Sequence, residues 1–176
     1  MDELLTPRTA RLDDPHVVEM IDEVQQEYVR RYGGPDSTPL RVEEFLPPVG
    51  LLFVVGDAEG AVGMGGWRGH DVGWRGHDDG PEAAGLLPGD AEIKRMYVRP
   101  RARGRGVARA LLRAIEHSAA AAGRGRLVLE TGLRQPEAIG LYTSSGYRPL
   151  VPKFGLYRHE EQSVCMVKNL ETSGAS

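Results

Sequence analysis

A glycine- and arginine-rich turn over residues 101–106 holds the residue types and spacing best suited to chemistry. Gly104 and Gly106 lack a Cβ atom, so another molecule can approach the backbone closely at both positions. The first N–H groups of the helix expected next have no intrahelical acceptor and lie at the positive end of its dipole. Amides arranged in this way bind phosphate, and the three arginines of the turn add positive charge. The turn therefore predicts a pyrophosphate-binding loop.

A strand and a helix must hold this turn in place. The strand is expected over residues 91–98, because β-branched and aromatic residues there end at a proline, which has no N–H to continue a ladder. The helix is expected over residues 107–122, where apolar residues recur at i, i+4 and i+8 from Val107. Gly123 provides the usual left-handed end of such a helix.

Two motifs within this strand–turn–helix context resemble those of one family. The turn contains neither a Gly-x-x-x-x-Gly-Lys-Ser/Thr nor a Gly-x-Gly-x-x-Gly motif. It reads Arg-x-x-Gly-x-Gly, which resembles the acetyl-CoA signature of the GCN5-related N-acetyltransferase (GNAT) family. Residues 135–147 resemble that family's second motif, Asn-x-x-Ala-x-x-Leu-Tyr followed by Gly-Phe/Tyr, with Gln135 in place of the asparagine.

The resemblance implies that acetyl-CoA is the cosubstrate and that no metal is required. The backbone of the strand would pair with the pantetheine arm, and the amides of the turn and of the first helical residues would bind the pyrophosphate. The cofactor-binding residues that the resemblance implies are Met96, Tyr97, Val98, Arg103, Gly104, Arg105, Gly106, Val107 and Ala108.

The resemblance also implies direct transfer of the acetyl group to a primary amine of a small molecule, peptide or protein, without an acyl-enzyme. Tyr142 matches the tyrosine that protonates the departing coenzyme A thiolate; the alternative is a core aromatic on an amphipathic helix. Glu92 resembles the general base that several members carry, because a protonated amine cannot attack a thioester. The alternative for Glu92 is a solvated strand residue paired with Lys94 or Arg95.

The order of the expected elements is that of a mixed α/β fold. Strands are expected over residues 9–12, 51–55, 61–67, 91–98, 126–131, 147–151 and 163–170. Helices are expected over residues 15–32, 41–46, 107–122 and 136–145. The resemblance implies one N-acetyltransferase domain over residues 1–170, with a mixed, twisted sheet of six to seven strands, about four flanking helices, and splayed fourth and fifth strands. Residues 171–176 are expected to be a disordered tail.

An unusual duplication lies between two expected strands. The sequence Trp-Arg-Gly-His-Asp occupies residues 67–71 and recurs at residues 74–78. Its two His-Asp pairs are suitable metal donors, whereas the surrounding glycines favour a lengthened surface loop. Because residues 69–90 are rich in glycine and aspartate, we expect a flexible loop there.

The composition bounds the remaining possibilities. The chain has 176 residues and a formal net charge of −3, so no overall positive field favours nucleic acid. It begins without the segments of a secretion signal and contains no run long enough to span a bilayer. The single cysteine, Cys165, suits a reducing compartment and is expected to be a packed core thiol, so a cytoplasmic location is expected.

Competing functions remain at this stage. An arginine-glycine RNA-binding segment is one, although such segments usually lie in long repetitive tracts. An acetyl-CoA-binding sensor or an inactive paralogue of the same fold is another. The acceptor amine is not identified by the sequence, and a homodimer is an expectation from the family alone.

Overall fold

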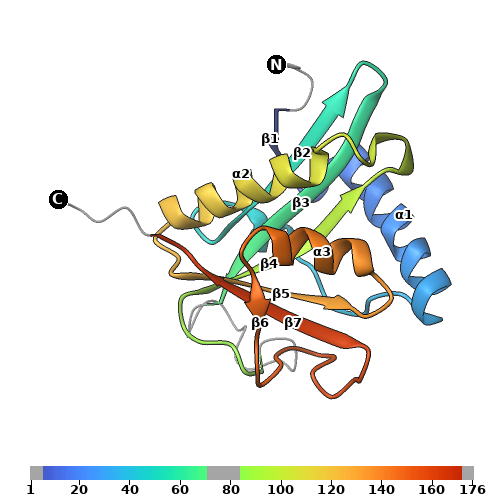
Figure 1. Ribbon diagram of the computed structural model, residues 1–176. Helices are drawn as coiled ribbons and strands as arrows, with labels where there is room; N and C mark the ends of the chain where they lie inside the picture. Colours follow the sequence, from blue (N-terminus) through green and yellow to red (C-terminus); the bar gives the residue numbers. More distant parts are fainter. Residues whose placement is uncertain (1–5, 71–83, 172–176) are drawn as a thin grey trace. The chain divides into compact units, whose positions relative to one another are not determined.

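The computed structural model describes residues 6–70 and 84–171 (Figure 1). Its strands are β1 (Arg8–Ala10), β2 (Gly50–Asp57), β3 (Gly60–His70), β4 (Asp90–Val98), β5 (Arg126–Gly132), β6 (Arg148–Pro149) and β7 (Ser163–Asn169). Its helices are α1 (Pro15–Tyr32), α2 (Val107–Ala121) and α3 (Pro136–Ser144), with 3₁₀ helices η2 (Val42–Phe45) and η4 (Pro100–Ala102). No helix within these ranges is long and apolar enough to cross a membrane.

The strands form one mixed sheet in the order β1-β2-β3-β4-β5-β7-β6. The ladder of β4 and β5 is parallel and joins Asp90–Glu92 to Arg126–Val128, while β1–β2, β2–β3, β5–β7 and β6–β7 are antiparallel. The mixed α/β sheet of seven strands is therefore confirmed. Of the four helices expected, three are α-helices, and the one expected over residues 41–46 is the 3₁₀ helix η2.

The chain divides into two compact units, each made of two segments. The first unit comprises Met1–Arg68 and Ile93–Ser118, and the second comprises Gly69–Glu92 and Ala119–Ser176. Strands β3 and β4 contribute residues to both. The single domain expected over residues 1–170 stays a prediction.

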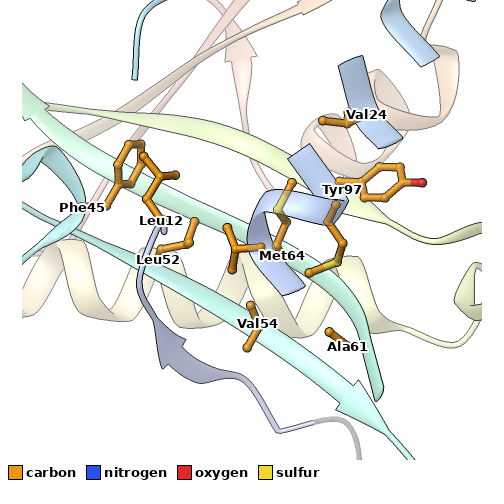
Figure 2. Packing of buried hydrophobic residues seen from close by; sticks show 10 residues of the cluster. Leu12, Val24, Phe45, Leu52, Val54, Ala61, Met64 and Tyr97 are labelled. Atoms are coloured by element: carbon orange, nitrogen blue, oxygen red, sulfur yellow. The ribbon is translucent and has the colours of Figure 1, made fainter. Parts of the chain in front are cut away.

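In the first unit, helix α1 begins and ends where its sequence indicates. The Asp14 carboxylate accepts a hydrogen bond from the His16 N–H at 3.1 Å, and Gly33 ends the helix in the left-handed region with φ of 82°. Its apolar face buries Val17, Met20 and Val24. Figure 2 shows Val24 in the core cluster with Leu52, Val54, Met64 and Tyr97, among other buried residues. Burial of each large apolar side chain stabilises the fold by about 1.5–3 kcal/mol.

Two glycines of β3 bring helix α2 close to the sheet. A Cβ atom at Gly63 would lie 2.7 Å from a methyl group of Val107, the first residue of α2. At Gly65 it would lie 3.3 Å from a methyl group of Ile115, also on α2. The first distance is too short for a real Cβ atom and the second is tight, so side chains at these positions would push α2 away from β3. The start of α2 is consequently placed by residues on β3.

In the second unit, β5 pairs with β7 along its full length, from Arg126 opposite Asn169 to Gly132 opposite Ser163. Cys165 on β7 is buried with Val128 and Phe154, and burial raises the pKa of its thiol, so the expected core thiol is confirmed. Strand β6 spans only Arg148–Pro149, whereas residues 147–151 were expected; Pro149 has no N–H to give to the ladder, and the N–H of Leu150 donates to the carbonyl of Cys165 at 2.9 Å beyond the regular strand.

The expected loop over residues 69–90 is shorter at both ends, because β3 extends through His70 and β4 begins at Asp90. The second copy of the duplication, residues 74–78, lies outside the described residues, as do the first five residues and residues 172–176 of the expected tail.

Candidate functional site

The turn before α2 has the backbone geometry that a phosphate site requires. Gly104 and Gly106 have φ angles of 74° and 83°, in the left-handed region that side chains disfavour. A Cβ atom at either position would meet nothing within 4 Å, so the backbone faces open space. Helix α2 begins at Val107, directly after the second glycine. A diphosphate therefore fits this turn, where exposed backbone and a helix N-terminus coincide.

Two of the three arginines in the turn contact one carboxylate. Arg101 donates from Nη1 to Oδ2 of Asp57 at 2.7 Å, and Arg105 donates from Nη1 to the same oxygen at 3.3 Å. Asp57 ends β2, and its hydrogen bond from Arg101 contributes most to lowering the pKa of the carboxyl group. The β2–β3 hairpin therefore holds both guanidinium groups beside the glycines.

The third arginine contacts helix α1. Arg103 donates from Nε to the carbonyl oxygen of Val98 at 2.9 Å and from Nη2 to Glu27. One and two helical turns earlier, Glu23 and Glu19 contact Arg99, at 2.7 and 2.9 Å from its Nη2. Three glutamates at i, i+4 and i+8 thus bind the chain that follows β4. Sequence reasoning missed this acidic stripe, although its spacing on an expected helix was a usable signal.

The three β4 residues implied for pantetheine binding have different surroundings. Tyr97 packs in the core (Figure 2), and its hydroxyl donates to Oε2 of Glu23 at 3.1 Å. Burial and the neighbouring Glu23 raise the pKa of Tyr97 to about 12, so the phenol stays neutral. Met96 lies beside Gly65, and the carbonyl of Val98 accepts the bond from Arg103 described above.

Glu92, the candidate base, lies in the second unit and is 2% exposed. Its Oε2 is 2.8 Å from Nε2 of His70, the last residue of β3. Its burial contradicts the alternative of a solvated strand residue, while Lys94 and Arg95, the partners named in that alternative, both contact Asp36. Sequence reasoning did not connect His70 with Glu92, since 22 residues separate them and His70 was considered only as part of the duplication.

Tyr142, the candidate acid, lies on α3 and is 4% exposed. Its ring centre is 5.5 Å from that of Tyr147, with the rings in an edge-to-face arrangement at 65°. The carbonyl of Tyr142 accepts hydrogen bonds from the N–H groups of Ser145 and Tyr147, each at 3.0 Å. Such burial suits a core aromatic, and it also provides the dry surroundings in which a phenol can act as an acid. The catalytic role stays a prediction.

The expected site residues are thus distributed over both units. Met96–Val98 and Arg103–Ala108 belong to the first unit, whereas Glu92 and Tyr142 belong to the second. Of the residues in the described ranges, no three or more histidine, cysteine or acidic side chains are grouped so that they could hold a metal ion.

Comparison with known proteins gives one consistent result. A model of the acetyltransferase (GNAT) family matches residues 18–147. An IAA acetyltransferase of Azospirillum brasilense is 45% identical over 82 residues, which are 47% of this chain and 53% of the relative, so the chain matches about half the length of that curated protein.

Solved structures agree in fold. A Klebsiella pneumoniae protein provisionally assigned as an acyl-CoA N-acyltransferase is 27% identical, with a TM-score of 0.68 over 94% of this chain and 97% of that one. The IAA acetyltransferase of Bacillus cereus is 16% identical, with a TM-score of 0.60 over 94% and 99%. Because the family model covers most of its length, the chain belongs to the acetyltransferase (GNAT) family.

Proposed function

We propose that this protein transfers the acetyl group of acetyl-CoA to the amine nitrogen of an acceptor. The observation that carries the proposal is the open turn of Gly104 and Gly106 at the N-terminus of α2, with three arginines around it. Membership of the GNAT family supports acetyl-CoA as the ligand of that turn.

Binding would use both the backbone and the arginines of the first unit. The amides from Arg103 to Ala108 would bind the pyrophosphate, and the backbone of Met96–Val98 would pair with the amides of the pantetheine arm. Arg101 and Arg105 already lie beside the glycines through Asp57. Guanidinium groups exchange a carboxylate for a phosphate without losing charge, so both arginines can move from Asp57 to the ligand.

The acid and the base would come from the second unit. Glu92 would accept a proton from the acceptor ammonium, directly or through water, while His70 keeps the carboxylate oriented through their 2.8 Å contact. The free amine then attacks the thioester carbonyl that acetyl-CoA supplies, and the carbon–sulfur bond breaks. Tyr142 would donate its proton to the departing thiolate, and the proton that the nitrogen loses as the amide forms would return to the Tyr142 phenolate through solvent. The products are the N-acetylated acceptor and coenzyme A.

The acceptor that we propose is a primary amine of a small molecule, a peptide or a protein. IAA appears in the names of two similar proteins, which makes it a compound to include when acceptors are tested.

Calorimetric titration with acetyl-CoA, desulfo-CoA and NAD tests the proposal. We expect acetyl-CoA and desulfo-CoA to bind and NAD not to bind, because the turn lacks a dinucleotide motif. Failure of both coenzyme A compounds to bind would refute the assignment of the turn. Acetyl-CoA binding without acetyl transfer to any member of a broad amine panel would identify a sensor rather than an enzyme.

A further inference from the structure

Arg95, in the middle of β4, has an unusual backbone. Its φ angle is 56°, and it is the non-glycine residue with positive φ in the part of the chain that the structure describes. In this region the Cβ atom of an L-residue crowds its own backbone, so another interaction must hold the conformation.

The side chain of Arg95 is anchored in the interior of the first unit. It is 3% exposed, and its Nη1 donates to Oδ2 of Asp36. Nζ of Lys94 lies 3.9 Å from the same oxygen, and the other oxygen of Asp36 accepts the N–H of Thr38 at 2.8 Å. The ion pair thus lies within a hydrogen-bonded cluster.

Asp36 is in turn fixed to helix α1. Nε2 of Gln25 donates to the carbonyl of Asp36 at 2.9 Å, and the N–H of Asp36 donates to Oε1 of Gln25 at 2.8 Å. Although burial opposes ionisation, Lys94 and Arg95 lower the pKa of Asp36 to about 2, so the carboxylate keeps its charge at neutral pH. The anchor therefore connects α1 to one residue of β4.

The residues after Arg95 are those expected to contact the cosubstrate. Tyr97, two residues on, is buried in the core cluster with residues of α1, whereas Met96 lies beside Gly65 of β3. Arg95, the residue with positive φ, therefore immediately precedes Met96–Val98. Its backbone angles set the direction in which this segment of β4 continues.

We propose that Arg95 is a positioning residue, whose ion pair with Asp36 holds the left-handed backbone of β4 and so orients Met96–Val98 for acetyl-CoA. The binding part of this inference rests on the proposed function. The backbone part does not, because it concerns the conformation of position 95 alone.

A matched pair of variants, Arg95→Ala and Arg95→Gly, tests the inference. Both remove the guanidinium, but only glycine adopts positive φ easily. We expect Arg95→Ala to bind acetyl-CoA about tenfold more weakly than the wild type, and Arg95→Gly to remain within about threefold. We also expect Arg95→Gly to melt about 2–4 °C above Arg95→Ala. If glycine binds no better than alanine while the wild type binds, the positioning role is refuted.

Asp36→Asn provides a second test that keeps Arg95. It should weaken acetyl-CoA binding in the wild-type background and change it less than about twofold in the Arg95→Gly background, where no anchor is needed. Equal weakening in both backgrounds would overturn the inference. If the wild type itself does not bind acetyl-CoA but Arg95→Gly still melts above Arg95→Ala, the proposed function fails and the backbone anchor stands.

Discussion

The carboxylates of Asp36 and Glu92 are both largely buried, but they contact different nitrogen-containing side chains. Asp36, in the first unit, accepts from the guanidinium of Arg95. Glu92, in the second unit, lies 2.8 Å from the imidazole of His70. A guanidinium presents five donors and a fixed charge, whereas an imidazole has two ring nitrogens, one of which can face a carboxylate while the other faces elsewhere. The first pair is therefore suited to fixing a backbone, and the second to orienting the carboxylate that we propose as the base.

This difference extends to the other expected site residues of each unit. The first unit contains the glycine–arginine turn and Met96–Val98, to which we assign binding. The second contains Glu92 and Tyr142, to which we assign proton transfer. If the division is correct, substitutions in the first unit change the affinity for acetyl-CoA, and substitutions in the second change turnover.

The largest expected effect is that of Glu92→Gln. Removing the proton acceptor should lower kcat about 1,000-fold with little change in acetyl-CoA affinity. The loss should be smaller at high pH, where more of the acceptor amine is already deprotonated. Steady-state kinetics from pH 6 to 10 measure this. An unchanged kcat would remove Glu92 from the mechanism and leave its contact with His70 as a structural one.

Tyr142→Phe should lower kcat about 100-fold, because the thiolate must then take its proton from water. Acetyl-CoA affinity should stay nearly constant, since a leaving-group acid acts mainly in the transition state. Tyr147→Phe is a suitable control, as it keeps the edge-to-face ring contact and alters a hydroxyl outside the proposed chemistry. Equal turnover of the Tyr142→Phe variant and the wild type would favour the core-aromatic interpretation.

Asp36→Asn should lower the free energy of unfolding by about 2 kcal/mol at neutral pH. This figure follows from the difference between the folded-state pKa of Asp36, about 2, and its ordinary value of 3.8. Because the folded-state pKa is the lower one, this stabilisation is complete above about pH 4 and is lost as the pH falls through about 2. Denaturant unfolding at pH 6 and pH 3 should therefore show a smaller difference between variant and wild type at pH 3.

The exposed pair of Asp13 and Arg11 offers a control for this measurement. Asp13→Asn should change stability less, because solvent screens an exposed ion pair. A pH-independent difference for Asp36→Asn would mean that the lost hydrogen bonds, and not the charge, explain its effect.

The smallest expected effect is that of Gly104→Val on affinity. A branched side chain at φ of 74° is strained and covers the open backbone, so we expect acetyl-CoA to bind about tenfold more weakly. Turnover at saturating acetyl-CoA should change much less, which isothermal titration and kinetics together would show. Gly34→Val, at a glycine with open space around it and no positive φ, is the matched control. Unchanged affinity of the Gly104 variant would contradict the phosphate-binding assignment.

The sequence predicted the local elements well because each depends on neighbouring residues. The cap at Asp14, the apolar spacing of α1 and the stop at Gly33 all lie within one helix, and the structure places its ends there. The strand–turn–helix around residues 91–123 was likewise predictable, because glycines, proline and apolar spacing act over a few residues.

Contacts between distant segments could not be predicted in the same way. Arg95 contacts Asp36 across 59 residues, and Arg101 contacts Asp57 across 44, so neither pair has a local pattern. The sequence left open whether Glu92 is a base or a solvated strand residue, and packing buries it beside His70. Pairing of this kind depends on strand register, which one sequence does not reveal.

The division of each compact unit into two segments has a consequence for synthesis of the chain. Gly69–Glu92 leaves the ribosome before any other part of the second unit exists, and Asp90 must wait for Arg126, which holds its carboxylate at 2.7 Å. The first unit is likewise incomplete until Ser118 has been made. Neither unit can therefore fold fully as a nascent N-terminal fragment, and neither can be expressed as one uninterrupted piece of the gene.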